Sequence, residues 1–314
     1  MTDIQKAILR TIAYHDVLDM ALTPFEVWVY LVGGSVIAAE LNDVMEAIAA
    51  LEEKGLLMQK RGFVMFADRE QLAQHRLETL NETDMKFKKT RWAFRILRFV
   101  PFVQVVFASG SMALGNSVAD SDVDVLIVLK GGRIWTGRFL VTALLHMLGA
   151  RRHGKRIANR VCLNHFVIDS APAIPFRTMY TARLYTSVVP LIVNDKNAEQ
   201  HFFDENSWMF DFLSAASRKL VPPVSVRTLS DDGITRLVRR FLEFLLGGAG
   251  GNGVEWFLRA IQQRHIRINP LTASRQGHVV ANDSMMSFHP ESREGRLLTA
   301  YRERLAVVGV EETG

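Results

Sequence analysis

The sequence contains a single cysteine, Cys162, so no disulfide bond can form within the chain. A chain without disulfides is suited to a reducing compartment. The opening residues MTDIQKAILRT lack a secretory signal pattern. The longest apolar stretch, FLVTALLHMLGA (139–150), falls well short of the roughly 20 residues that a membrane-spanning helix needs. We therefore expect a cytoplasmic protein with no membrane partner.

Basic residues are scarce in the first 60 positions, which hold four of them against nine acidic residues. The formal charge of this part is −5, whereas the whole chain carries +5, so the remaining residues carry +10. Contacts to phosphates supply much of the affinity of proteins for nucleic acids. A polyanionic partner is therefore expected to bind the later part of the chain.

Apolar residues are abundant, at 48% of the 314 residues, and 23% of the residues are charged, which is typical of a globular protein with a sizeable core. The length allows two or three domains. Changes of pattern along the chain predict an α/β protein in four parts. They are a winged-helix-like domain (1–67), a connecting helix (68–100), a core that contains buried strands (101–195) and a helical C-terminal region (196–314).

The first part carries the signals of three helices and a hairpin. Apolar spacing predicts one helix near residues 4–12, and TPFE (23–26) is a capping box that starts a second. LNDVMEAIAALEEKG (41–55) has one apolar face and stops at its glycine. LLMQKRGFVMFA (56–67) predicts a hairpin. This order is typical of a winged helix.

The third helix of a winged helix enters the major groove when such a domain binds DNA. Here that helix carries Asp43, Glu46, Glu52 and Glu53 against Lys54 alone. Its charge therefore opposes binding to the phosphates of DNA. We expect packing or protein contact to be its role, and a winged-helix transcription regulator stays an alternative.

A turn with glycine and serine follows the first predicted strand of the core. FVQVVFA (102–108) predicts a buried strand that ends at Ser109, Gly110 and Ser111, where glycine permits a tight turn. MALG (112–115) then supplies one helical turn, and unpaired N–H groups at a helix start attract phosphate. We therefore expect Gly110 and Ser111 to hold phosphate groups.

The next predicted strand, DVDVLIVL (122–129), begins with acidic residues at alternate positions. Side chains two apart on a strand share a face, so Asp122 and Asp124 are expected to point the same way. Two adjacent carboxylates repel each other and are costly to desolvate unless a cation lies between them. Oxygen ligands suit Mg²⁺, so the segment predicts a magnesium and triphosphate site.

Three other interpretations of this segment fit less well. GSMALGNS (110–117) lacks a phosphate loop's lysine, because Asn116 stands in that place. DSDVD (120–124) starts like a calcium-binding loop. However, Val125 stands where such a loop needs a glycine, and Gly131 stands where it needs its final glutamate. A plain acidic surface loop leaves the preceding Gly-Ser pair unexplained.

The pattern Gly110-Ser111, ten residues, Asp122-x-Asp124 and then an apolar strand resembles the DNA polymerase beta type nucleotidyltransferase superfamily. More widely, segments such as LTPFEV, SDVDVLIV, VCLNHF and ENSWMFDFL are similar to an uncharacterised group of bacterial nucleotidyltransferase-domain proteins. The resemblance implies a mixed-sheet nucleotidyltransferase core. It also implies Mg²⁺ on the two aspartates, an NTP as substrate, and transfer of a nucleoside monophosphate to a hydroxyl of an unknown acceptor, which is a protein, an RNA or a small molecule.

One position departs from the superfamily's pattern. Its active members place a third carboxylate in a later strand, and the strand VCLNHFVI (161–168) has Asn164 there. Asparagine offers an oxygen but no charge, so it is no base. Asp169 is the nearest acid, but it lies an odd number of residues from Asn164 and so faces the other side of the strand. His165 is interpreted as structural. Two hypotheses therefore remain: an enzyme in which Asn164 is the third site residue, and a catalytically weakened nucleotide-binding regulator.

A basic turn, RRHGKR (151–156), lies before that strand. It is interpreted as a solvated turn, with contact to a phosphate or an RNA backbone as the alternative. Trp208, Trp256 and Tyr185 occupy apolar helical positions and are expected in the core.

Overall fold

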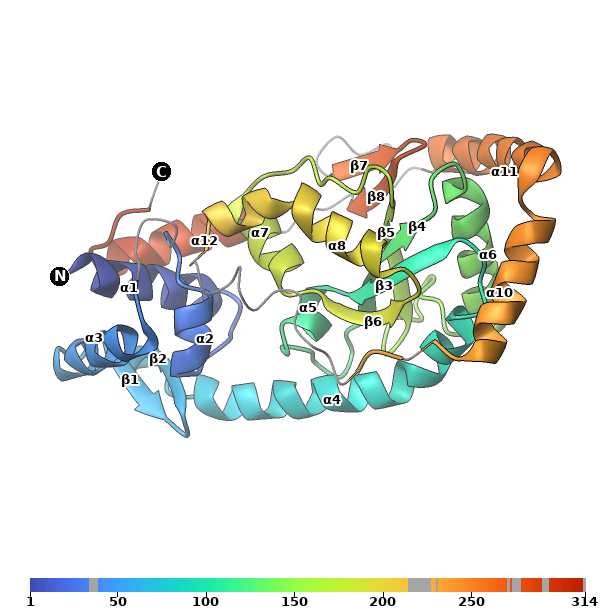
Figure 1. Ribbon diagram of the computed structural model, residues 1–314. Helices are drawn as coiled ribbons and strands as arrows, with labels where there is room; N and C mark the ends of the chain where they lie inside the picture. The colour runs from blue at the N-terminus through green and yellow to red at the C-terminus, as the bar shows by residue number, and fades with distance from the viewer. Residues whose placement is uncertain are drawn as a thin grey trace.

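The computed structural model describes residues 1–33, 39–213, 227–229, 231–269, 272, 278–289 and 294–312. It is an elongated α/β protein with a group of helices and a hairpin at one end and a mixed sheet at the other (Figure 1). The predicted α/β class with a mixed sheet is confirmed. None of the described helices has the length and apolar character needed to cross a membrane.

The N-terminal part consists of α1 (Asp3–Asp16), α2 (Pro24–Val29), α3 (Leu41–Glu53) and the hairpin of β1 (Leu57–Lys60) and β2 (Phe63–Phe66). The capping box predicted at TPFE is present, because the Thr23 hydroxyl accepts a hydrogen bond from the backbone N–H of Glu26 at 3.1 Å. Arg61 and Gly62 have φ angles of 54° and 82°, as a two-residue type I′ turn requires.

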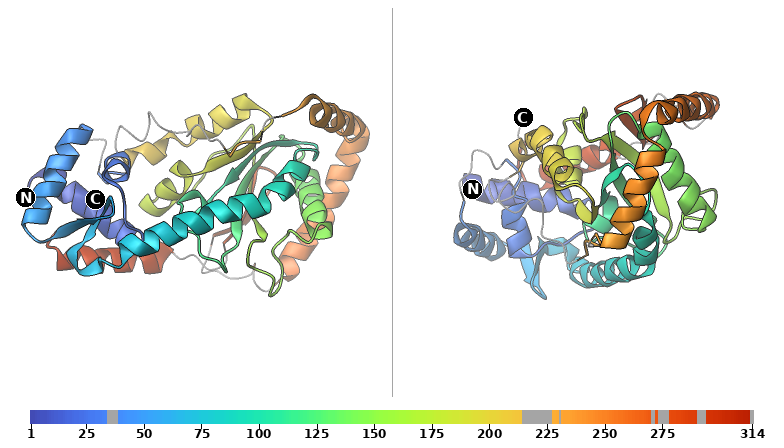
Figure 2. Two further views of the ribbon diagram at one scale, coloured as in Figure 1. Left: turned by 90° about the horizontal axis from the view of Figure 1, so that it is seen from below. Right: turned by 45° about the vertical axis from the view of Figure 1, so that its right-hand side comes forward.

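A long helix, α4 (Leu72–Leu97), connects this part to the sheet after a short 3₁₀ turn, Ala67–Arg69 (Figure 2). Nearly half of its buried side chains are polar or charged, because part of the helix packs against a polar loop. Arg76 is 2% exposed and Lys86 is 0% exposed. Both donate hydrogen bonds to backbone oxygens of the segment 114–121, which lies between the two strands that carry the predicted site.

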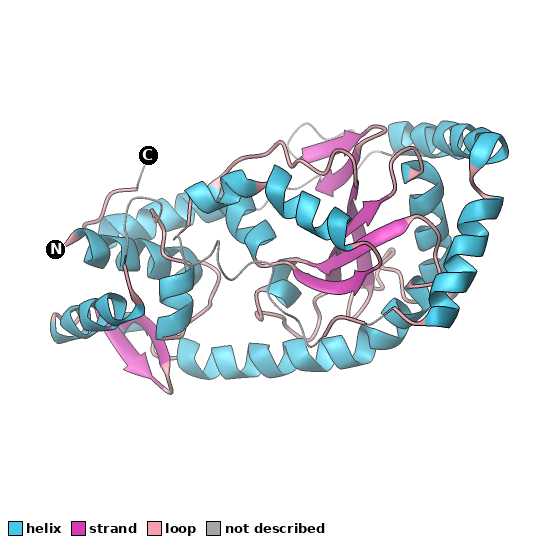
Figure 3. Ribbon diagram, in the orientation of Figure 1, coloured by secondary structure: helices cyan, strands magenta, loops and turns pink. Residues whose placement is uncertain are grey.

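The sheet has the strand order β6-β3-β4-β5-β8-β7 (Figure 3). At its centre, β3 (Val103–Ala108) pairs antiparallel with β4 (Val123–Leu129), which pairs parallel with β5 (Val161–Ile168). At one edge, β6 (Val189–Val193) pairs antiparallel with β3. The sheet is therefore mixed, as the resemblance implied for the core.

Helices cover both faces of this sheet, so strand residues alternate between two apolar clusters. Val123, Val125 and Ile127 pack on the side of α4 and α6 (Ile134–Met147). Leu126 and Val128 pack on the side of α7 (Met179–Thr186) and α8 (Lys196–Glu205). Asp122 and Asp124 have the parity of this second set, so they belong to the α7 side of the sheet.

The C-terminal region (196–314), predicted to be helical, also contains strands. The prediction was wrong for two short strands, β7 (His278–Ala281) and β8 (Met285–His289), which extend the sheet beyond β5. Strands of four or five residues give little periodic signal, and their pairing with β5 depends on contacts far apart in sequence. Part of the region, including 214–226, lies outside the described residues.

The last described helix, α12 (Glu294–Val307), returns to the N-terminal part. Tyr301 is fully buried there and makes an edge contact with Tyr14 of α1, with the ring centroids 5.9 Å apart. The predicted winged-helix-like unit of residues 1–67 therefore shares its apolar core with a helix from the far end of the chain.

Two other C-terminal helices, α10 (Gly233–Leu245) and α11 (Gly248–Ile268), were found by their apolar spacing, but their apolar faces point outward. Trp256 is 71% exposed, so its predicted place in the core was wrong, whereas Trp208 and Tyr185 are buried as expected. The reason lies in the polar side chains of these helices. Glu243 and Glu255 turn inward and accept hydrogen bonds from core backbone N–H groups.

Candidate functional site

The sheet brings the ends of three strands to one edge. Because β3 runs antiparallel to β4, and β5 parallel to it, the end of β3 meets the starts of β4 and β5. The one-turn helix α5 (Gly110–Ala113) directly follows β3. The backbone N–H of Ser109 donates to the carbonyl oxygen of Asp124 at 2.9 Å, which fixes the turn against β4.

Gly110 is required at this turn for two reasons. Its φ angle is +62°, in the region that favours glycine. A Cβ atom placed on Gly110 would lie 2.5 Å from Oδ2 of Asp124. The glycine of the predicted phosphate-holding pair therefore packs directly against one of the two predicted metal ligands, and Ser111 follows it in the same turn.

The two aspartates lie close together, as their alternation on the strand indicated. Carboxylate oxygens of Asp122 and Asp124 and the Sγ atom of Cys162 all lie within 4.8 Å of one another. All three side chains are partly buried. We call this set the acidic cluster; it joins the start of β4 to the start of β5.

Asn164, the predicted third site residue, contacts the acidic cluster. Its side-chain Nδ2 donates a hydrogen bond to Oδ1 of Asp124 at 2.9 Å. The amide therefore orients the carboxylate and has no charge to add to it. Asp169 lies at the other end of β5, where its Oδ1 accepts a hydrogen bond from the N–H of Gly131 at 2.9 Å, so it does not replace the missing acid.

Two members of the site were not predicted as such. Cys162 stands opposite Asp124 in the parallel register of β4 and β5. Arg152, from the basic turn, donates a hydrogen bond to Oδ2 of Asp122, and its guanidinium lies 3.6 Å from Sγ of Cys162. Cys162 is two residues before Asn164, so both side chains lie on the same face of β5. This spacing is visible in the sequence and could have predicted that Cys162 belongs to the site. No sequence pattern indicated which arginine of the turn would reach the cluster.

Burial and mutual repulsion change the acidity of the cluster. Burial, followed by the charge of Asp122, raises the pKa of the Asp124 carboxyl to about 6, against the smaller opposing effects of Cys162, Arg152 and Asn164. Burial also raises the pKa of the Cys162 thiol, with Asp124 and Asp122 acting in the same direction. The cysteine is therefore a protonated neighbour of the carboxylates at neutral pH and not a thiolate.

These properties fit a divalent cation with oxygen ligands. The raised pKa of Asp124 reflects its burial, followed by the charge of Asp122, and a bound cation would favour the charged form of both carboxylates. Hard cations such as Mg²⁺ prefer oxygen ligands, so the two carboxylates suit such a cation better than the thiol of Cys162. Asp122 and Asp124 are therefore the residues that could hold a hard divalent cation such as Mg²⁺.

The same pKa leads to a prediction about stability. An ordinary aspartate has a pKa near 3.8, so Asp124 ionises at a lower pH in the unfolded chain than in the folded protein. The folded state therefore loses stability as pH rises from about 4 to about 6. We expect Asp124→Asn to remove this loss. In a chelator at pH 7.5 the variant should be more stable than the wild type by about 2–3 kcal/mol, and at pH 4 by almost nothing.

Chemical denaturation at the two pH values measures this difference. Asp120→Asn is the matched control, because Asp120 is an exposed aspartate of the same loop. Equal stabilities of Asp124→Asn and wild type at pH 7.5, or a gain of the same size at pH 4, would contradict the assigned pKa shift.

His165 has the structural role that the sequence indicated. It is 3% exposed, and its Nδ1 lies 2.7 Å from the hydroxyl of Tyr185 on α7. This hydrogen bond attaches α7 to β5 beneath the acidic cluster.

No family, curated protein or solved structure with which the chain was compared matches it. The acidic cluster and the turn beside it are therefore the features of the molecule that point to a function.

Proposed function

We propose that this chain is a magnesium-dependent nucleotidyltransferase, which moves a nucleoside monophosphate from an NTP to a hydroxyl group of an acceptor. The observation that carries the proposal is the packing of Gly110 against Asp124, with Asp122 in the same cluster. This packing places a turn suited to phosphate next to a carboxylate pair suited to a divalent cation. The mixed sheet and the resemblance of its motif support the same proposal.

Each residue of the site has a part in this proposal. Asp122 and Asp124 hold Mg²⁺, which when bound neutralises charge on the phosphates during transfer. Gly110 and Ser111 hold the terminal phosphates of the NTP. Asn164 keeps the Asp124 carboxylate in place through its amide. The acceptor hydroxyl forms a bond to the α-phosphorus, and the bond to the pyrophosphate leaving group breaks.

Arg152 has a more specific part. Its guanidinium is the positive charge nearest to Asp122 and is 43% exposed as a side chain. A divalent cation on the aspartates would compete with this ion pair. The released guanidinium is then free to contact a phosphate oxygen, for which its donor geometry is suited.

Incubation of the full chain with each α-labelled NTP, Mg²⁺ and cell extract tests the proposal. Label on a protein, an RNA or a small molecule, dependent on Mg²⁺, supports nucleotidyl transfer. Absence of labelled product with all four NTPs, while the NTP still binds, contradicts it.

A second candidate function is a nucleotide-binding regulator without turnover. It is favoured by Asn164, which occupies the place of the third carboxylate and makes a hydrogen bond to Asp124 instead of adding a charge. Transfer by the wild type separates the two candidates, because Mg²⁺-dependent transfer excludes the regulator and NTP binding without transfer favours it. If the wild type does not transfer, transfer by Asn164→Asp would show that the missing acid is the only defect.

A further inference from the structure

The helices α10 and α11 lie at the end of the molecule opposite the N-terminal part and expose a large apolar surface (Figure 1). Eleven of the 23 exposed large apolar side chains among the described residues belong to these two helices. On α10 they recur every three or four residues and so form one continuous face. This face consists of Ile234, Leu237, Val238, Phe241, Phe244 and Leu245.

Polar side chains on the opposite side of α10 turn this face away from the core. Arg239 is buried and donates to Oδ1 of Asn194 at 2.9 Å, and Glu243 accepts a hydrogen bond from the N–H of Phe102 at 3.0 Å. An amphipathic helix normally buries its apolar stripe against the core. Phe244 is instead 82% exposed, which is expected of an interaction surface.

The helix α11 continues this surface. Its Glu255 accepts a hydrogen bond from the N–H of Thr136 at 2.9 Å and so directs a polar side of the helix toward α6. Trp256 is exposed, and a tryptophan ring with an N–H group suits the boundary between water and an apolar phase. Further exposed apolar side chains of α11 are Phe257, Ile261 and Ile268.

The charges beside the apolar faces are positive. The two helices contain six arginines and two glutamates, and both glutamates point inward. Residues three or four apart are neighbours on a helix, so Arg240 lies between Leu237 and Phe244. Arg264 lies in the same way between Ile261 and Ile268. Both arginines are exposed, and neither forms an ion pair within the described part of the chain.

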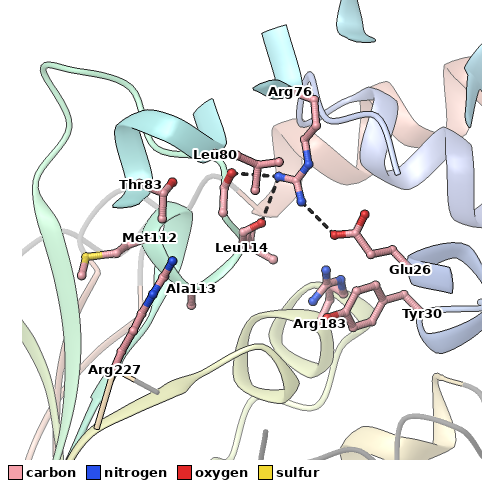
Figure 4. Close-up of a pocket in the computed structure, with 11 residues that line it drawn as sticks. Glu26, Tyr30, Arg76, Leu80, Thr83, Met112, Ala113, Leu114, Arg183 and Arg227 are labelled. Atoms are coloured by element: carbon pink, nitrogen blue, oxygen red, sulfur yellow. Dashed lines mark hydrogen bonds and ion pairs between the residues drawn. The ribbon is translucent and has the colours of Figure 1, made fainter. Parts of the chain in front are cut away.

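Arginines elsewhere in the chain show the contrast. Figure 4 shows Arg76, which donates to Oε1 of Glu26 at 2.8 Å beside a cavity of about 210 Å³. Arg227 lines the same cavity and forms an ion pair with Asp84 at 3.8 Å. These guanidinium groups are engaged within the chain, whereas the two beside the apolar faces remain available to a partner.

We propose that α10 and α11 bind the surface of a lipid bilayer with anionic headgroups, with Arg240 and Arg264 at the level of the lipid phosphates. An apolar face with aromatic residues, flanked by arginine, is the pattern of helices that lie in the plane of a membrane. Arginine lays its apolar stem along such a face and keeps its charge in water. We expected no membrane partner because no stretch is long enough to span a bilayer, but a helix on the surface needs no such length.

A second copy of the chain fits this surface less well. It would bring the same arginines to the contact, and carboxylates beside the helices are already paired. Arg236 pairs with Asp231 at 2.9 Å, and Arg259 pairs with Asp283 at 3.0 Å. Like charges brought together oppose association, whereas anionic lipids attract arginine.

Flotation of the full chain with vesicles tests the proposal. Vesicles of phosphatidylcholine and phosphatidylglycerol in equal amounts are compared with vesicles of phosphatidylcholine alone. We expect the wild type to bind the mixed vesicles and Phe244→Glu to bind them at least about tenfold more weakly, because a large apolar side chain is lost from the contact. Arg240→Gln should weaken binding to the mixed vesicles by about fivefold and leave binding to the neutral ones unchanged.

Two control variants define the location. Val307→Glu makes the same kind of change on α12, where Val307 is 74% exposed, and should bind like the wild type. Asp124→Asn should also bind like the wild type. Glu243 attaches α10 at Phe102, just before β3, whereas the acidic cluster lies at the far end of β3. The result is therefore independent of nucleotidyl transfer.

Wild-type protein that does not float with the mixed vesicles overturns the proposal, and so does equal binding of the wild type and Phe244→Glu. Equal binding to mixed and neutral vesicles overturns the choice of an anionic surface. Sedimentation velocity without lipid tests the other occupant. A wild-type dimer that Phe244→Glu dissociates, without flotation, would assign the surface to a second chain.

Discussion

Under the proposed function, Asp124→Asn is expected to lower the rate of nucleotidyl transfer by about a thousandfold or more, because it removes a charge from the proposed cation site. Asparagine has nearly the same shape as aspartate and can still accept the hydrogen bond that Asn164 donates to Asp124 at 2.9 Å. The loss therefore reports charge and not a change of packing. Measurements of kcat at saturating NTP and Mg²⁺, together with Mn²⁺ affinity by electron paramagnetic resonance, check it.

Asp120→Asn is the matched control for activity also, since Asp120 is exposed and lies outside the acidic cluster. It should transfer at close to the wild-type rate. Transfer by Asp124→Asn within threefold of wild type would remove the aspartate pair from the mechanism and with it the proposed function.

The two effects expected of Asp124→Asn have opposite signs. The variant loses activity, and without metal it gains stability at neutral pH, because the carboxylate has a pKa raised to about 6 by burial and by Asp122. A carboxylate whose ionised form costs stability in the metal-free protein is a candidate functional group. The opposition between the two effects is the expected property of a group placed for binding a cation.

The local part of the site could be predicted from the sequence because it depends on short-range geometry. The period of two along a strand places Asp122 and Asp124 on one face wherever the strand lies. The need for glycine at a positive φ explains Gly110 in the same way. These features, and the hairpin turn at Arg61 and Gly62, are properties of a few consecutive residues.

The rest of the site depends on contacts between distant segments. Arg152 reaches Asp122 across 30 positions of the chain, and Cys162 meets Asp124 only through the register of β4 and β5. The outward apolar faces of α10 and α11 could not be predicted either. Apolar spacing locates the stripe on a helix, but the inward hydrogen bonds of Glu243 and Glu255 decide which face contacts the core.

Lys86 shows most clearly how a long-range contact supports the site. It is 0% exposed and donates to the carbonyl oxygens of Ala119 and Ser121 at 3.0 and 2.8 Å, and to Oδ1 of Asn159 at 3.2 Å. Ser121 immediately precedes Asp122, so this lysine fixes the loop from which the acidic cluster begins. Burial lowers the pKa of its ammonium group, which the nearby acids partly oppose.

Lys86→Met is therefore expected to destabilise the protein by about 3 kcal/mol, because methionine fills the space but removes three hydrogen bonds from a charged donor, and of the three oxygens only that of Ser121 keeps another donor, the N–H of Asn159. Denaturation by urea measures the change as a lower midpoint with an unchanged slope. Lys89→Met, on the exposed side of the same helix, should change the free energy of unfolding by less than about 0.5 kcal/mol. A loss below about 1 kcal/mol in Lys86→Met would mean that the loop is held by its other contacts. These include the bond from the N–H of Ser117 to the hydroxyl of Thr83, and Lys86 would then have no part in positioning Asp122.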